Sequence, residues 1–290
     1  MYRLHLSLFT LLASALLASS ASAQTPACNE LSAEKRRLAQ QILAAEHPYD
    51  CCDDTIARCL KQKPTCSLAY RLAQNICRRV AAGQDRQRIS RSLARRARTA
   101  MQDKGKVSID LKGVPVAGDA SAPITLVEYA CSRCPYCSRI TPELYRAVVE
   151  GPLKGKVRFY FKLFPIRGHR YGKEGGLAFL AAAELGRFWD YLTYFYQRFD
   201  EYCPKLQAQW AEKAGMNRAA FEMIANDPST REALVRSKKE GIVNKVDSTP
   251  TFFINGKKYQ GEVNSNELID VLEEQYERIK GITHRKLAGR

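Results

Sequence analysis

Cys134 and Cys137 are separated by Pro135 and Tyr136 at a point where the chain changes from an apolar run at 124–129 to a helical pattern. In the first turn of a helix, unpaired N–H groups and the helix dipole stabilise an anion, so the pKa of Cys134 is expected to fall. Two intervening residues let Cys137 close a disulfide with Cys134. The pair predicts thiol–disulfide exchange, in which Cys134 attacks and Cys137 resolves the mixed disulfide.

Other readings of this motif remain open. Many C-x-x-C pairs are zinc half-sites or structural bridges. Cys131 extends the motif to C-x-x-C-x-x-C, but a bacterial iron–sulfur run would require a cysteine at position 141, which is Thr141. A binding module in which every cysteine is an inert bridge is a further alternative, and it predicts no reactive thiol after mild reduction.

The first residues are typical of a secretory signal peptide. Arg3 supplies a positive start, 6–18 is a short apolar run, and Ala21-Ser22-Ala23 offers a cleavage site. We therefore expect residues 1–23 to be a cleaved signal peptide and the protein to be periplasmic or otherwise exported. An uncleaved anchor is the alternative. In an exported chain, an even count of ten cysteines indicates a disulfide framework.

Residues 24–101 are predicted to form a small domain of about four helices without a strand, stapled by disulfides because its core is small. Cys59 and Cys66 flank a turn and are predicted to pair. Cys77 is predicted to pair with Cys51 or Cys52, and Cys28 with the remaining one. A metal site is less favoured because no histidine stands at ligand spacing.

The formal net charge is +16, and six arginines fall between Asp85 and Arg98. The favoured interpretation is the solvated face of an amphipathic helix, and the alternative is a docking surface for a partner or anionic lipid. Because the signal peptide directs the chain out of the cytoplasm, nucleic acid is not an expected partner.

The rest of the chain alternates strand and helix signals. Residues 102–122 read as a linker with one possible short strand at Val107–Leu111, and 123–290 as a second domain with a helical insert at about 173–240. This order predicts an α/β layer fold. The expected elements are strands at 124–129 and 157–164, a helix at 135–150, a hairpin at 251–260 and a closing helix through 268–279.

Two stretches resemble the DsbA-like branch of the thioredoxin superfamily, which includes DsbG-like and ScsC-like members. The first is Ile124-Thr-Leu-Val-Glu-Tyr-Ala-Cys-Ser-Arg-Cys-Pro-Tyr-Cys137, and the second is Val246-Asp-Ser-Thr-Pro-Thr-Phe-Phe-Ile-Asn-Gly256. Phe164-Pro165-Ile166 and Gly186-Arg187-Phe188-Trp189 resemble parts of the family's helical insert. The resemblance covers about 107–280, implies a thioredoxin fold, and leaves out the six-cysteine segment.

The resemblance implies roles at matching positions. Cys134 would be the nucleophile and Cys137 the resolving thiol. Pro250 would be cis, and Thr249 would offer backbone groups to a bound substrate beside Pro135 and Tyr136.

The resemblance also implies a role for Glu128, which lies six residues before Cys134, where the family often places a buried acid. There it would exchange a proton with Cys137, and the alternative is a partly exposed residue at the end of the strand. Lys162 on the next strand would either tune this acid or be exposed. Cys131 and Cys203 are expected to form a structural bridge, the rival being a third redox thiol at Cys131. His169 is expected to be a surface or loop-packing residue rather than a catalytic one.

The resemblance leaves several functions open. We expect general oxidation of exported client proteins, with a membrane or periplasmic redox partner and no cofactor beyond the cysteine pair. The alternative is an isomerase or reductase of DsbG or ScsC type, in which the N-terminal helical domain makes a homo-oligomer.

Overall fold

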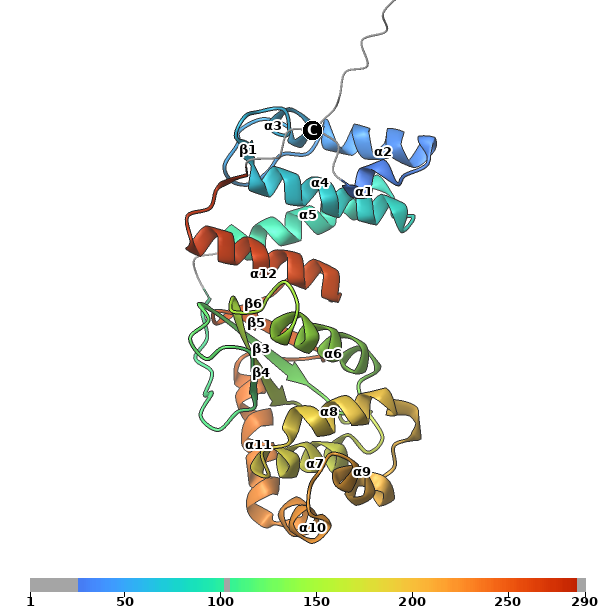
Figure 1. Cartoon of the computed structure of the whole chain (residues 1–290), viewed down its shortest axis with the longest axis vertical. Helices are drawn as coiled ribbons and strands as arrows, with labels where there is room; N and C mark the ends of the chain where they lie inside the picture. The colour runs from blue at the N-terminus through green and yellow to red at the C-terminus, as the bar shows by residue number, and fades with distance from the viewer. Residues whose placement is uncertain (1–25, 102–104, 286–290) are drawn as a thin grey trace, which may run out of the picture.

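The computed structural model describes residues 26–101 and 105–285. A helical unit lies at one end of the molecule, a sheet in the middle and a second group of helices at the other end (Figure 1). The predicted signal peptide and its cleavage site lie outside the described residues. Within the described part, no helix combines the length and apolarity needed to cross a bilayer.

The central sheet has five strands in the order β2-β4-β3-β5-β6. β3 and β4 are parallel, and the other neighbours are antiparallel. The predicted strand at Val107–Leu111 is wrong, because only an isolated bridge joins Lys106 to Lys257 there. The strands are β2 Val116–Ala117, β3 Ile124–Ala130, β4 Val157–Leu163, β5 Thr251–Ile254 and β6 Lys257–Lys258.

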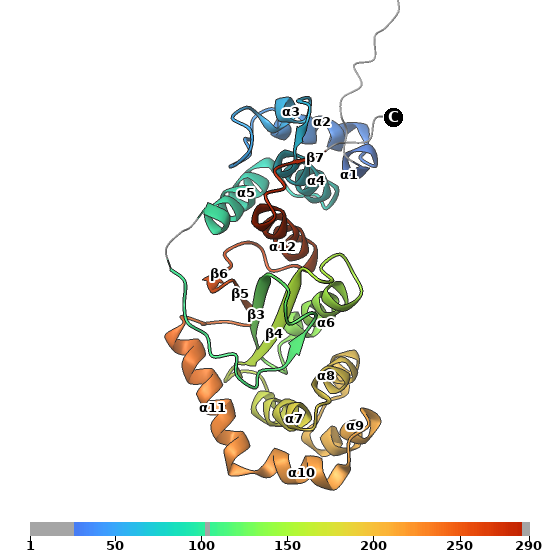
Figure 2. The same cartoon turned by 60° about the vertical axis from the view of Figure 1, so that its left-hand side comes forward.

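Residues 105–122 were expected to be a linker but pack along the sheet instead. Val107 and Ile109 lie against the buried rings of Tyr129 and Phe253. Figure 2 shows this segment running beside the sheet and the long helix α11 (Pro228–Val243). The segment therefore covers one face of the sheet and is not an unpacked linker between two domains.

The opposite face of the sheet is covered by α6 (Pro135–Val149) and α12 (Ser265–Ile279). Leu144 and Leu272 are fully buried against strand residues such as Leu126. Burying each such side chain contributes about 1.5–3 kcal/mol. This α/β arrangement is the predicted thioredoxin fold, and α6 starts at the edge of the sheet where β3 ends.

The helical insert packs around aromatic rings. Phe179 and Phe195 are fully buried, with ring centroids 4.9 Å apart in an edge-to-face arrangement. Phe161 of β4 joins the same cluster, which fixes the insert on the sheet. The helices are α7 Gly172–Glu184, α8 Phe188–Gln197, α9 Gln207–Lys213, α10 Arg218–Asn226 and α11, with short 3-10 turns at Phe199–Glu201 and Pro204–Leu206.

The N-terminal unit is helical but contains one short strand that was not expected. β1 (Thr65–Cys66) pairs antiparallel with β7 (His284–Arg285) from the far end of the chain. This backbone pairing joins the unit to the segment that follows α12. The helices of the unit are α1 Pro26–Asn29, α2 Ala33–Leu43, α3 Ile56–Cys59, α4 Ser67–Ala81 and α5 Arg86–Met101.

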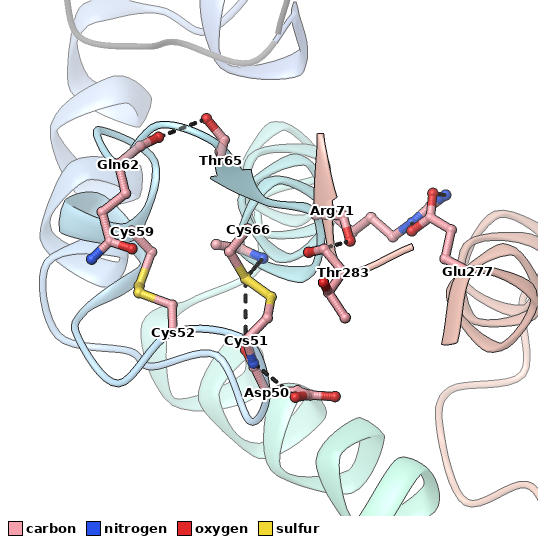
Figure 3. Close-up of a disulfide and its surroundings, with 12 residues drawn as sticks. Asp50, Cys51, Cys52, Cys59, Gln62, Thr65, Cys66, Arg71, Glu277 and Thr283 are labelled. Carbon is pink, nitrogen blue, oxygen red and sulfur yellow. Dashed lines mark hydrogen bonds and ion pairs between the residues drawn. A yellow bond between two sulfur atoms is a disulfide. The ribbon is translucent and has the colours of Figure 1, made fainter. Parts of the chain in front are cut away.

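Three disulfides staple this unit, and the predicted pairing was wrong. The bonds are Cys28–Cys77, Cys51–Cys66 and Cys52–Cys59. Cys66 caps the start of α4, where its sulfur accepts from the Ala69 N–H, and it faces Cys51 rather than Cys59 (Figure 3). The adjacent residues Cys51 and Cys52 therefore bond in different directions, to α4 and to α3.

The arginine-rich helix α5 is only partly a solvated face. Arg86, Arg88, Arg91 and Arg98 are exposed, as expected. Arg96 is 1% exposed and pairs with Asp270 and Glu274 of α12, each at 2.7 Å. Its burial was missed because an amphipathic pattern assigns arginine to solvent.

Similar pairs continue along α4. Arg71 contacts Asp270 at 2.9 Å and Glu277 at 2.8 Å, and Arg79 contacts Glu267 at 2.5 Å. The N-terminal unit is thus held on α12 by buried charges.

Candidate active site

Cys134 sits at the boundary between strand and helix. It is the N-cap residue of α6, and Pro135 is the first helical residue. Its N–H donates to the carbonyl of Cys131 at 3.0 Å, and its own carbonyl accepts from Ser138 at 3.0 Å. Proline suits this position because no N–H is needed in the first turn. The loop and the helix start therefore hold Cys134 in place at the end of a buried strand.

The two thiols of the motif are free in the structure and differ in their acidity. A hydrogen bond from Cys137 is the largest cause that lowers the pKa of Cys134 to about 5, against the opposing effect of burial. The N–H groups of Tyr136 and Cys137 add to the lowering. Burial raises the pKa of Cys137 well above its ordinary value. At neutral pH the pair holds a single proton, on Cys137.

The loop before β5 lies against this thiol. The Thr249–Pro250 peptide bond is cis, in agreement with the expectation for Pro250. The carbonyl oxygen of Thr249 is 3.1 Å from the sulfur of Cys134. Two segments more than a hundred residues apart in the chain thus meet at the reactive sulfur.

Pro135 and Tyr136 lie on the surface beside Cys134. The Tyr136 side chain is 61% exposed, and the guanidinium of Arg139 stands 5.9 Å from its ring centroid. Cys134 itself is only 2% exposed. A large exposed ring next to a recessed sulfur provides a surface against which a polypeptide can pack.

Glu128 lies beneath the cysteine pair, on β3. It is completely buried, and the Thr141 hydroxyl is 2.8 and 3.0 Å from its two carboxyl oxygens. Burial raises the pKa of Glu128 to about 8, against hydrogen bonds from Thr141 and Cys137 that lower it. The carboxyl group is therefore mostly neutral at pH 7, next to the thiol whose proton must move. Thr141 was not singled out as a functional residue, although its position four residues after Cys137 places both on one helix face.

Lys162 does not tune this carboxyl group, so that suggestion was wrong. In the β3–β4 register Glu128 stands opposite Phe161, and Tyr129 stands opposite Lys162. Because successive strand residues point to opposite faces, Lys162 lies on the other side of the sheet. There it is buried, forms an ion pair with Glu240 of α11, and donates to the Asp110 carbonyl at 2.6 Å.

The predicted Cys131–Cys203 bridge is also wrong. Both thiols are free. Cys131 is fully buried, with its sulfur 3.3 Å from Nδ1 of His169, whereas Cys203 is half-buried in a loop of the insert. Burial raises the pKa of Cys131, which keeps it protonated at neutral pH. His169 is a loop residue packed on this thiol.

Replacing Glu128 with glutamine is expected to slow the attack of Cys137 on a mixed disulfide at Cys134 by about 100-fold, since a positioned proton carrier commonly contributes that much. In the wild type the resolving rate should rise as Glu128 loses its proton. The inflection is expected somewhat below pH 8, because Cys134 is uncharged in the mixed disulfide and no longer raises the pKa of Glu128. Rapid-quench measurements across pH 5–9 would follow this step.

Thr141→Val is the matched control for this prediction. It keeps the carboxyl group but removes a hydrogen bond that lowers its pKa, so the inflection should move to higher pH. An unchanged inflection in Glu128→Gln would exclude Glu128 as the proton carrier.

Comparison with known proteins assigns a family to the second part of the chain. A family model described as Thioredoxin matches residues 110–274. Disulfide bond formation protein D of Bacillus subtilis is 27% identical over 184 residues, which cover 57% of this chain and 78% of that protein.

A second group of relatives is much longer than this chain. The Na(+)/H(+) antiporter NhaA 3 of Salinispora tropica is 31% identical over 159 residues, which cover 54% of this chain and 24% of the antiporter. The chain thus spans about a quarter of the length of the antiporters that it matches.

Among solved structures, oxidised BdbD from Bacillus subtilis matches with a TM-score of 0.51 and 21% sequence identity. The match covers 61% of this chain and 100% of that chain. At this identity the match concerns the fold.

Proposed function

The chain belongs to the thioredoxin family, and on that premise we propose that it is a DsbA-like, exported oxidase that passes the Cys134–Cys137 disulfide to client proteins. The relative from Bacillus subtilis carries disulfide bond formation in its name, which supports this chemistry. Export rests on the signal-like residues 1–23.

The proposed reaction has two exchange steps. A client thiolate attacks the sulfur of Cys134, the Cys134–Cys137 bond breaks, and Cys137 leaves with the electron pair and takes a proton from neutral Glu128. A second client thiol, as its thiolate, attacks the client sulfur of the mixed disulfide, and Cys134 leaves as a thiolate. The client loses two electrons and gains a disulfide, and the protein becomes the dithiol. A membrane or periplasmic oxidant then restores the disulfide.

The low pKa of Cys134 carries the proposal. A thiol with a pKa near 5 is about 99% thiolate at pH 7, against a few per cent for an ordinary cysteine. The larger thiolate fraction raises the rate of nucleophilic attack, but this gain is offset, because the nucleophilicity of each thiolate falls with its pKa at a Brønsted slope of about 0.4–0.5. What remains is a good leaving group and a stabilised reduced form. Both favour transfer of the Cys134–Cys137 disulfide to a client over the reverse reaction, in which a client disulfide oxidises this pair.

The reduction potential tests the direction of transfer. Equilibration with glutathione buffers and thiol trapping should give a value near about −120 mV, as expected when the reduced form is stabilised. A Cys137→Ser variant identifies the titrating pair, because it cannot form the disulfide. A value of about −200 mV or lower would contradict the oxidase and favour the isomerase or reductase, for which the N-terminal unit would serve oligomerisation.

A further inference from the structure

A cavity lies beside the active site, in a part of the molecule that the proposed exchange does not use. It is bounded by the loop 165–171, the start of α7 and one side of α11. Its volume is about 420 Å³, which is within the range of sites that bind small ligands or a few residues of a peptide.

The lining of this cavity is strongly basic. Five cationic side chains contribute to it, and Glu174 is the single acidic residue among the described residues that line it. Like charges gathered in a concave site repel one another and raise the local concentration of anions. The five cationic residues are Arg167, Arg170, Lys173, Arg231 and Lys238.

These cations divide into two groups. Lys238 donates to the Pro165 carbonyl at 2.6 Å, and Arg170 donates to the Tyr171 hydroxyl at 2.6 Å, so protein contacts fix both. Arg167, Lys173 and Arg231 are exposed, and within the described part of the chain no carboxylate pairs with them. Three cations are therefore available to a ligand.

The cavity also has an apolar wall. Leu234 is buried, Ile166 is half-buried, and Val235 is 47% exposed on the surface of α11. Basic groups beside an aliphatic wall fit a ligand that carries carboxylates next to apolar side chains. An acidic stretch of polypeptide has this chemistry.

The cavity is linked to the reactive cysteine by two contacts. His169 lines it, and Nδ1 of His169 is 3.3 Å from the sulfur of Cys131. The carbonyl of Cys131 accepts from the N–H of Cys134 at 3.0 Å. A polypeptide joined to Cys134 through a disulfide would therefore have its neighbouring residues close to this basic cavity.

We propose that the cavity binds acidic segments of the client polypeptides that exchange disulfides at Cys134. The inference rests on the proposed function and adds a substrate preference to it. Electrostatic complementarity of this kind raises the association rate and weakens as ionic strength increases.

Dithiol peptides test the preference. Two peptides share a cysteine pair and differ in their flanking residues, glutamate in one and glutamine in the other. The oxidised wild type should oxidise the acidic peptide about tenfold faster in kcat/KM at low salt. This ratio should fall towards one in the double variant Arg167→Gln/Arg231→Gln, and also at high ionic strength.

The control removes the same charge elsewhere. Arg88→Gln/Arg91→Gln alters two exposed arginines of α5, at the other end of the molecule (Figure 1). This variant should keep the wild-type ratio. Equal oxidation of both peptides by the wild type, or an equal loss of preference in both double variants, would overturn the proposal.

A binding measurement separates this inference from the proposed function. The acidic peptide with serines in place of its cysteines is titrated by fluorescence anisotropy. Its affinity should fall several-fold in Arg167→Gln/Arg231→Gln and stay unchanged in Arg88→Gln/Arg91→Gln. If this pattern holds while no peptide is oxidised, the oxidase proposal fails and the acid-binding cavity stands. If neither double variant weakens binding, the cavity proposal fails.

Discussion

In the reduced protein, Cys134 is expected to react with iodoacetamide as a thiolate down to a pH of about 5, with a rate that is flat from about pH 6.5 to 8. Cys137 should not contribute to this curve, because burial holds its pKa far higher. An ordinary cysteine would show a rate that is still rising through pH 8. The alkylation rate, followed by mass spectrometry across pH 4–9, measures the pKa directly.

Two variants of Cys137 test the cause of this shift. Cys137→Ala removes the hydrogen bond that lowers the pKa of Cys134 most, so the curve should move to higher pH. Cys137→Ser keeps a hydroxyl donor and should stay closer to the wild type. If alanine and serine give the same curve as cysteine, the neighbouring thiol does not stabilise the thiolate. Cys134→Ser should abolish disulfide exchange entirely.

The same low pKa makes the folding stability of the reduced protein depend on pH. Because the folded pKa is depressed, the thiolate stabilises the folded, reduced protein fully above the unfolded cysteine pKa of about 8.5. That contribution is lost as pH falls through about 5. The disulfide form has no thiolate at Cys134 and therefore lacks this contribution to its stability. Acidification therefore lowers the stability of the reduced form relative to that of the disulfide form.

Local motifs made the active site predictable from the sequence. A C-x-x-C pair after an apolar strand and a Thr-Pro pair before a hairpin are short-range signals. Each fixes a backbone position that depends little on the rest of the chain. Glu128 is buried, as the resemblance implied from its place six residues before Cys134. Strand alternation turns it towards the helix that carries Cys137. The same alternation contradicts the suggestion that Lys162 tunes Glu128, because the two side chains point to different faces of the sheet.

The features that were missed depend on contacts between distant segments. Cys51 and Cys52 are neighbours, and no sequence pattern says which of them faces α4. The β1–β7 pairing joins residues more than two hundred positions apart, and each strand has only two residues. Such short pairings leave no periodic signal. The basic cavity likewise draws its arginines from a loop and from α11, so it exists only after folding.

Replacing Arg96 with leucine is expected to destabilise the protein by about 3–5 kcal/mol, because it leaves Glu274 buried without its cation and removes one of the cations that pair with Asp270. Burial alone would raise the pKa of Asp270, but Arg96 and Arg71 outweigh it and lower that pKa. The pair thus contributes stability above the unfolded aspartate pKa and loses it as pH falls through the lower folded value. Urea titration followed by circular dichroism measures the loss.

Two further variants decide whether the charge or the side chain matters. Arg98→Leu alters an exposed arginine of the same helix and should change the free energy of unfolding by less than about 0.5 kcal/mol. Adding Asp270→Asn and Glu274→Gln to Arg96→Leu should restore much of the lost stability, since no unpaired charge then remains buried. A loss in Arg96→Leu no larger than in Arg98→Leu would mean that these ion pairs do not hold the N-terminal unit on α12.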